Sequence, residues 1–261
     1  MRWLWLSLML ALCWAALVRA DDAGEIAYGD LVKGEISVRD YEALYCFEGE
    51  AGDVVKIFLK PANDSYSWSG WYHPALLLLN ADGDVIAELH SYDSAAMIQA
   101  LPATGRYQII ATGWHGRTRD EVGAFDLSLE ALAELKPGEA LAGAASTDES
   151  QHYVVQADRD FSITYRLTDG DFRPEVSVGV IAEDPYQCSI DSTSCSSDSG
   201  GSNLHDVAKL SGVRLQSGRL SARVNSSAAE VYIVEVDKQE WYHYERKQTA
   251  EFTLELTFDE P

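Results

Sequence analysis

The sequence predicts an all-β protein made of two tandem antiparallel β-sandwich domains behind a signal peptide. Three observations predict this fold class. Short runs of β-branched and aromatic residues, separated by turn residues, dominate from Gly29 onward. No stretch after the first twenty residues combines helical periodicity with the length of a stable helix. The order of elements in the first half of the chain returns in the second half, which favours two domains.

Residues 1–20 have the pattern of a secretory signal. Arg2 supplies an early positive charge, an apolar core follows, and the small residue Ala20 ends the segment before two aspartates. A membrane-anchoring helix is the alternative, but the apolar run is shorter than the roughly 18 to 20 residues that a span needs. A lipoprotein modified at Cys13 is a second alternative, although Leu12 stands where a small residue is expected. We therefore expect a secreted or periplasmic protein with no membrane insertion after cleavage.

The chain has 261 residues and a formal net charge of −22. Removal of residues 1–20, which hold Arg2 and Arg19 and no acid, leaves 241 residues and a charge of −24. This length fits two ordinary domains. So negative a chain repels nucleic acid and anionic membranes, which excludes both as partners. The acidity favours solubility in the extracellular medium and leaves divalent cations as a further class of partner.

The cysteines fit an exported protein. Cys188 and Cys195 are separated by six residues, and we expect a disulfide between them in an oxidising compartment, worth about 2 to 3 kcal/mol in the chain-entropy view. A thiolate metal site is the alternative, but no second Cys or His pair lies at ligand spacing. Cys46 lies within a strand pattern and is expected to be a free cysteine in or beside the core.

Turn residues delimit the strands of the first half. Glycine stands at a hairpin position in residues 50–53, 80–84 and 102–105, and the flanks of these turns are apolar. The predicted strands are residues 31–38, 43–48, 54–59, 75–79, 85–89, 97–100, 106–111 and 124–129.

The second half repeats the first. The opening segment 29–34 returns at 138–143, and Tyr45-Cys46-Phe47 returns as Tyr153-Val154-Val155. Further matches join residues 73–78 to 173–178, 106–110 to 230–234 and 125–129 to 252–256. We therefore predict a first domain over residues 24–132, a linker over 133–137 with a proline stop, and a second domain over 138–258.

The first copy resembles the bacterial pre-peptidase C-terminal (PPC) domain over nearly all of residues 24–132. The residues that carry the resemblance are 29–34, 45–47 with the 50–53 turn, 76–83, 101–107 and 123–127. The resemblance implies a jelly-roll-like sandwich found beside secreted proteases, whose proteolytic activity lies in a separate catalytic domain. The second copy is degenerate, because Asp158-Arg159-Asp160 replaces the Ala-Gly-Asp turn. His73 stands where relatives often carry an aspartate, so a calcium ligand used by some relatives would be absent.

The sequence offers no catalytic motif. It has no Gly-x-Ser-x-Gly and no His-Glu-x-x-His, and its six histidines do not pair at i, i+2 or i+4. We expect no enzyme and no metal site; a small hydrolase with an unrecognised site is the alternative. Asp82-Gly83-Asp84 and residues 189–206 offer oxygen ligands for calcium, but Asp-Gly also suits a hairpin turn, so no cofactor is assigned and calcium remains an alternative.

The aromatic segment 66–73 is the most distinctive feature, because loops normally avoid such aromatic density. We predict ligand contact by Trp68, Trp71, Tyr72 and Trp114. A related cluster, residues 241–244, lies at the matching place in the second copy. Flat aromatic rings beside polar donors suit sugars or protein hot spots. The alternative is that these rings cap the open ends of their own sandwiches.

These observations predict a noncatalytic exported binding or accessory protein that mediates protein or surface-polymer contacts. The expected partner is an extracellular or periplasmic protein or polysaccharide. A carbohydrate-binding protein that uses the same aromatic residues is one alternative. An accessory protein or inhibitor of a secreted protease is another, and only the family resemblance implies it.

Overall fold

The computed structural model describes residues 24–37, 39–62, 74–91, 94–113, 123–146, 150–170, 175–181, 204–210, 217–222, 230–237 and 249–258. Every regular element in these residues is a β-strand, which confirms the predicted all-β class. The strands of the first half are β1 (Gly24–Glu25), β2 (Leu31–Ile36), β3 (Glu42–Gly49), β4 (Val54–Pro61), β5 (Pro74–Leu79), β6 (Val85–His90), β7 (Ala95–Ala100), β8 (Gly105–Gly113) and β9 (Gly123–Ala131). Those of the second half are β10 (Ala133–Glu134), β11 (Ala140–Ser146), β12 (Gln151–Ala157), β13 (Phe161–Gly170), β14 (Glu175–Ile181), β15 (Leu204–Leu210), β16 (Ser217–Ala222), β17 (Glu230–Asp237) and β18 (Thr249–Phe258).

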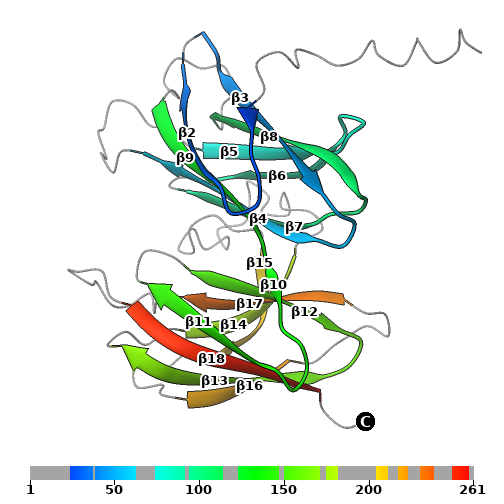
Figure 1. The fold of residues 1–261 in the computed structure, drawn as a ribbon, viewed down its shortest axis with the longest axis vertical. Helices are drawn as coiled ribbons and strands as arrows, with labels where there is room; N and C mark the ends of the chain where they lie inside the picture. Colours follow the sequence, from blue (N-terminus) through cyan, green and yellow to red (C-terminus); the bar gives the residue numbers. More distant parts are fainter. Residues whose placement is uncertain are drawn as a thin grey trace, which may run out of the picture.

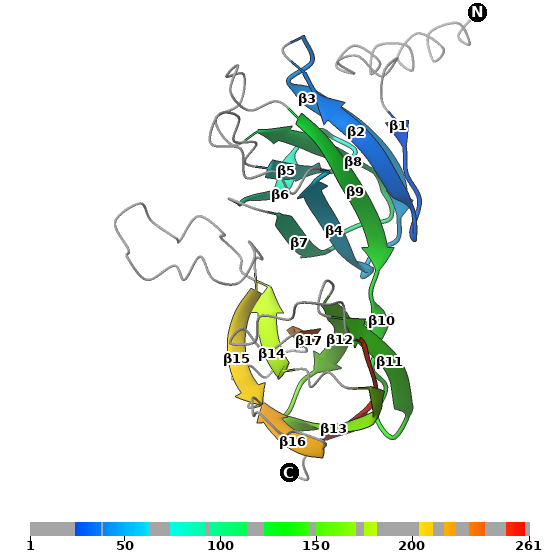
Figure 2. The ribbon, with the colours of Figure 1, turned by 90° about the vertical axis from the view of Figure 1, so that its left-hand side faces the viewer.

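Each half is a sandwich of two sheets. The first half pairs a five-stranded sheet, β1-β3-β8-β5-β6, with a four-stranded sheet, β2-β9-β4-β7. The second half pairs β10-β12-β17-β14-β15 with β11-β18-β13-β16. The two orders coincide strand for strand, so β1 corresponds to β10, β8 to β17 and β9 to β18. Figures 1 and 2 show the two sandwiches one above the other, with β9 leading directly into β10.

A glycine packed against two aromatic rings recurs in both halves. In the first half, Gly34 on β2 lies against Phe125 and Tyr45, whose rings meet edge to face at 6.4 Å. In the second half, Gly143 lies against Tyr153 and Phe252, whose rings meet in the same geometry at 6.3 Å. A side chain at either glycine would enter the space of these rings. The same local packing therefore fixes the first strand of each four-stranded sheet.

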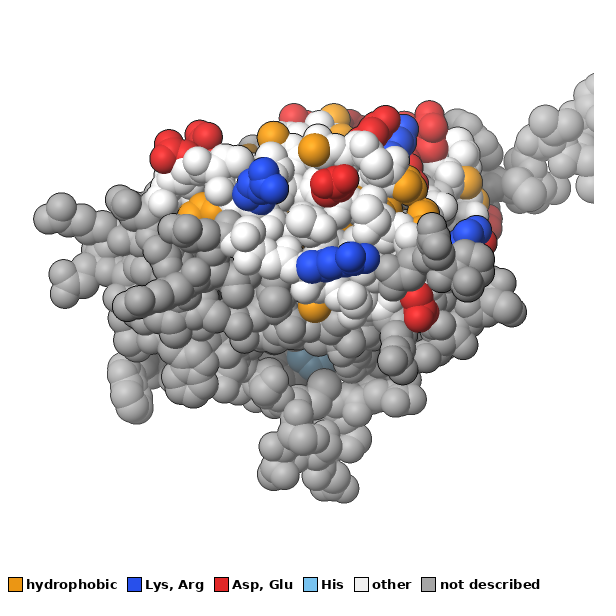
Figure 3. Space-filling view, turned by 90° about the horizontal axis from the view of Figure 1, so that it is seen from below, with side chains coloured by type: hydrophobic (Ala, Val, Ile, Leu, Met, Phe, Trp, Pro, Cys, Tyr) orange, Lys and Arg blue, Asp and Glu red, His pale blue; other side chains and the backbone are white. Residues whose placement is uncertain are grey.

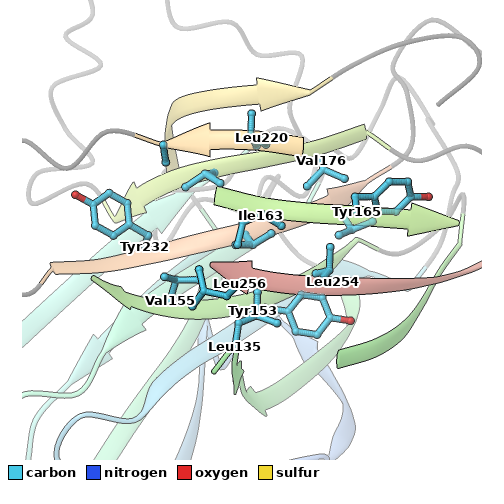
Figure 4. Packing of buried hydrophobic residues seen from close by; sticks show 14 of the residues in the cluster. Leu135, Tyr153, Val155, Ile163, Tyr165, Val176, Leu220, Tyr232, Leu254 and Leu256 are labelled. Carbon is cyan, nitrogen blue, oxygen red and sulfur yellow. The ribbon is translucent and has the colours of Figure 1, made fainter. Parts of the chain in front are cut away.

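Each sandwich has its own apolar core between its sheets. In the second half, alternate residues of β13 and β18 point inward, because successive side chains of a strand point to opposite faces. Figure 4 shows Ile163, Tyr165, Leu254 and Leu256 in one packed cluster with Val176 of the opposite sheet. Burial of each large apolar side chain contributes roughly 1.5–3 kcal/mol relative to exposure. The first half has an equivalent core around Ile57, Leu76 and Phe125.

The junction between the halves differs from the expected linker. Ala133 and Glu134 form β10 and pair in parallel with Tyr153 and Val154 of β12. Leu135 is buried in the second core and its N–H donates to the carbonyl oxygen of Val154 at 2.8 Å. Residues 133–135 thus belong to the second sandwich, because the apolar Leu135 fills that core. Only Leu132 separates the last residue of β9 from the first of β10.

The four sheets leave two unlike outermost faces. On β1-β3-β8-β5-β6, the residues that alternate with the core include Leu44, Ile110 and Leu77, which are partly buried and pair across β3, β8 and β5. On β11-β18-β13-β16, the outward residues are mainly polar: Ser162, Thr164, Arg166, Thr253, Glu255, Arg219 and Ser221. Figure 3, seen from below, shows charged side chains and small, separate orange patches spread among white atoms.

The predicted strands of the first half all occur, and each bound agrees or differs by at most two residues. The short strand β1 was absent from the sequence prediction because two residues cannot show an alternating pattern. Cys46 is free and buried, as its place in a strand pattern predicts. The described part of the chain contains no apolar helix long enough to cross a bilayer. Residues 1–20, the predicted signal, lie outside the described residues.

Candidate functional site

One end of the first sandwich bounds two connections that carry aromatic residues. Residues 62–73 join β4 to β5, and residues 114–122 join β8 to β9. The last residue of β4 pairs with Phe125 near the start of β9, and the first residue of β5 pairs with the last residue of β8. The two connections therefore leave from neighbouring strand ends. We call this end the β4–β5/β8–β9 end.

The predicted contact residues Trp68, Trp71, Tyr72 and Trp114 belong to these two connections. All four lie outside the described residues, so their positions stay predictions. What the structure brings together is the set of strand ends from which their segments leave. The sequence could not show this, because β4 and β8 belong to different sheets and are far apart along the chain.

A hydrogen-bonded turn borders the same end. Ile36, at the end of β2, pairs with the first residue of β9. Ser37 follows, and its Oγ accepts the backbone N–H groups of Arg39 at 3.2 Å and Asp40 at 3.1 Å. The hydroxyl of Thr112 on β8 donates to the carbonyl oxygen of Tyr41 at 2.9 Å. These hydrogen bonds hold the turn after β2 against the end of β8, the strand from which residues 114–122 leave.

His90 lies at this end as the last residue of β6, paired with Ala75 of β5. Partial burial lowers the pKa of His90, and nearby Glu88 opposes that effect. Because burial disfavours the charged imidazolium, His90 is neutral at pH 7. The adjacent Ser91 donates its backbone N–H to the carbonyl oxygen of Pro74 at 3.0 Å.

The opposite end of the first sandwich consists of tight turns. Asn80 Oδ1 accepts the backbone N–H groups of Asp82 at 3.0 Å and Asp84 at 2.9 Å, and Gly83 has a φ of 85°. Positive φ is readily adopted by glycine, so Asp82-Gly83 meets a turn requirement. Within the described ranges no group of three or more His, Cys, Asp or Glu side chains could hold a metal ion. The turn interpretation accounts for residues 80–84 without calcium.

The second sandwich has a corresponding end. Residues 238–248, which include the aromatic cluster 241–244, join β17 to β18, the equivalents of β8 and β9. The connection that holds Cys188 and Cys195 joins β14 to β15 and leaves from the other end, where Ile181 pairs with Leu204. Both cysteines lie outside the described residues, so their disulfide stays a prediction.

His152 lies against an acidic residue of the neighbouring strand. Its Nε2 lies 3.3 Å from Oε1 of Glu235, its partner residue on β17, and its side chain is 3% exposed. Its Nδ1 is buried and has no hydrogen-bond partner. A base that is so enclosed gives a substrate no access. The pair therefore has the geometry of a structural contact and not that of an accessible catalytic base.

The described strands define a class: an all-β chain built of antiparallel sandwich sheets. No family model and no curated protein matches the chain. Among solved structures, it is similar to the pre-peptidase C-terminal domain of a collagenase from Bacillus anthracis at 16% identity and a TM-score of 0.32. That match covers 43% of this chain and 99% of the collagenase domain.

Two further solved structures contain tandem modules. The CBM22-1–CBM22-2 tandem of Paenibacillus barcinonensis Xyn10C is 12% identical, with a TM-score of 0.25, and the match covers 90% of this chain and 93% of that one. The structure of the M60 catalytic domain with CBM51-1 and CBM51-2 of Clostridium perfringens ZmpB is 8% identical, with a TM-score of 0.25 and 83% of this chain covered. This chain spans about a third of the ZmpB structure, 33%.

Proposed function

We propose that the chain is a noncatalytic exported binding or accessory protein that contacts a protein or a surface polymer through the β4–β5/β8–β9 end. The observation that carries the proposal is the strand pairing that brings the ends of β4, β5, β8 and β9 to one end of one sandwich, since residues 62–73 and 114–122 leave from these ends. These connections hold Trp68, Trp71, Tyr72 and Trp114. Aromatic rings supply large contact areas at low cost in conformational entropy, which makes them frequent contact residues.

The proposal includes the domain organisation. We propose that residues 1–20 are removed on export and that the remainder comprises two PPC-type domains, the second degenerate. The repeated strand order and the repeated glycine–aromatic packing support two units of common design. The pairing of β10 with β12 supports a second unit that begins at Ala133. The net charge of −22 supports a partner other than nucleic acid or an anionic membrane.

The chemistry of the described residues supports a role without catalysis. Catalytic histidines need a nucleophile or substrate within hydrogen-bond reach. His152 contacts a carboxylate but is enclosed, so its imidazole fits a structural role. Burial lowers the pKa of His90, which disfavours its charged form.

Affinity gel electrophoresis tests the proposal. The mature protein, residues 21–261, would migrate through gels that contain soluble xylan, β-glucan, chitosan or pectin, beside the double variant Trp68→Ala/Trp71→Ala. The matched control is Trp241→Ala, which removes an indole from the corresponding connection of the second half. Melting temperatures within about 2 °C of the wild type would show that each variant is folded.

Retardation that the double variant loses and the control keeps would support a carbohydrate-binding protein that uses this end. Equal retardation of all three proteins would place sugar binding elsewhere and overturn the site. If no polysaccharide retards the wild type, the test moves to proteins secreted by the source cells. Capture of a secreted protease by the wild type and the Trp241→Ala control, but not by the double variant, would support the accessory or inhibitor role. Capture that ignores the double substitution would reject this end as the contact.

A further inference from the structure

The outer face of β4 and β7 carries buried apolar residues. Val55, Ile57 and Leu59 of β4 point into the first core, so Val54 and Lys56 point away from it. Val54 is nevertheless buried, as is Ile98 on the outer face of β7. A sheet face that points away from its own core loses its exposure only if something else covers it. Another part of the molecule must therefore pack against β4 and β7.

The covering surface is the outer face of β12 and β17. Tyr153 and Val155 point into the second core, while Val154 points outward, and Ile233 of β17 lies on the same outer face. Val154 and Ile233 form one buried cluster with Val54 and Ile98. The members that pack against it are also drawn from both halves: Ala100, Leu132, Ile181, Leu204 and Val231. This cluster, which we call the inter-sandwich cluster, is separate from either core.

A buried lysine borders the inter-sandwich cluster. Lys56 is 7% exposed, and its Nζ donates to the carbonyl oxygen of Ser150 in the second half at 3.3 Å. The same Nζ lies 5.7 Å from the ring centroid of Phe58, a cation–π distance. An ammonium group is costly to bury without partners. Its bond to Ser150 therefore sets a preferred position of one half against the other.

The junction between the halves is too short to act as a flexible linker. Leu132 is the single residue between β9 and β10, and its N–H donates to the carbonyl oxygen of Val54 at 2.8 Å. Its side chain packs against the inter-sandwich cluster. Independent domain motion needs a linker that can change direction over several residues. Here the connecting residue is itself part of the contact.

We propose that the two sandwiches form one rigid body, in which the outer face of β4 and β7 is a docking surface whose partner is the β12–β17 face of the same chain. The two halves then tumble and unfold as one unit. Neither face is suited to solvent, because each would expose contiguous aliphatic side chains. The inference concerns the described strands only and stands whether or not the first sandwich binds a sugar or a protein.

The experiment uses mature protein, residues 21–261, and the variants Ile98→Asp and Ile233→Asp, each of which places a charge in the inter-sandwich cluster. Val85→Asp is the matched control, because Val85 lies on an outer sheet face and is 51% exposed. Small-angle X-ray scattering measures the radius of gyration, and calorimetry counts the unfolding transitions. Near-UV circular dichroism shows whether both cores persist.

We expect the wild type and Val85→Asp to scatter as one compact particle and to unfold in one transition. Each interface variant should keep its near-UV signal, gain in radius of gyration and separate into two transitions. If an aspartate variant fails to fold, the milder variant Ile98→Ala replaces it. Ile98→Ala should begin to unfold several degrees below the wild-type transition. Two transitions or flexible scattering from the wild type would overturn the proposal. So would interface variants that behave as Val85→Asp does.

Discussion

The glycine of the repeated aromatic packing gives a sharp prediction, the substitution Gly34→Ala. A Cβ at Gly34 would lie 2.3 Å from Cζ of Phe125 and 2.7 Å from the hydroxyl oxygen of Tyr45. Phe125 is fully buried, so its ring cannot move aside without displacing the core. Overpacking of this kind costs about 1–3 kcal/mol. Loss of glycine entropy in the unfolded chain offsets about 0.4–1 kcal/mol, so we expect a net loss of roughly 1–2 kcal/mol.

Urea denaturation followed by tryptophan fluorescence measures this loss. The matched control is Gly105→Ala, because Gly105 is also a strand residue but a Cβ there would meet nothing within 4 Å. The control should be neutral or up to about 1 kcal/mol more stable. The double variant Gly34→Ala/Phe125→Leu should be less destabilised than the two single changes added together, because leucine vacates the space that the new methyl group needs.

Two results would refute the reasoning. Gly34→Ala as stable as the wild type would show that the ring relaxes freely. Strictly additive effects in the double variant would show that Gly34 and Phe125 do not share the space. At the corresponding position of the second half, a Cβ on Gly143 would lie 2.2 Å from the hydroxyl oxygen of Tyr153. Gly143→Ala should therefore be destabilising to a similar extent.

Three further predictions concern the cores. Ile57→Ala should cost about 2–5 kcal/mol in urea denaturation, since Ile57 is fully buried; a cost below about 1 kcal/mol would contradict its packing. Burial and a hydrogen bond to Glu230 raise the pKa of Tyr232 to about 12. The unfolded chain, with a tyrosine pKa of about 10, then loses its proton first, so the free energy of unfolding should fall as pH rises above about 10, and less steeply in Tyr232→Phe. Cys46 should react with iodoacetamide far more slowly in native than in urea-unfolded protein, by peptide mass spectrometry, because it is buried; equal rates would contradict its burial.

The fold class followed from local patterns that tertiary structure did not override. Alternation in segments such as 125–129 and 252–256 places Phe125 and Phe252 in their cores, and both strands occur in matching sheets. The match between residues 29–34 and 138–143 corresponds in space to two glycines in the same packing. The matched segments form equivalent strands in the two sandwiches because the residues that they share pack in equivalent places in each core.

The contact between the sandwiches could not be read from alternation, which assumes one buried face per strand. Val54-Val55-Lys56-Ile57 is buried on both faces, and its nearly continuous apolar character was the available signal. The sequence prediction placed a linker at residues 133–137 because Pro137 stops a strand. It overlooked the apolar Leu135, whose side chain lies in the second core. The candidate binding end depends on strand pairing between distant segments, and no local pattern contains that information.

The sheet faces that point away from the inter-sandwich cluster differ in polarity. At the C-terminal end of the molecule, the outward face of β13 and β16 is polar, and Ser162 and Ser221 satisfy each other through their hydroxyl groups at 2.9 Å. Proteins built from stacked units end in such polar caps, which stop further stacking. The N-terminal end shows Leu44, Ile110 and Leu77 instead. Among the described residues, the polar outer face thus belongs to the second sandwich, which gives that end of the molecule the character of a cap.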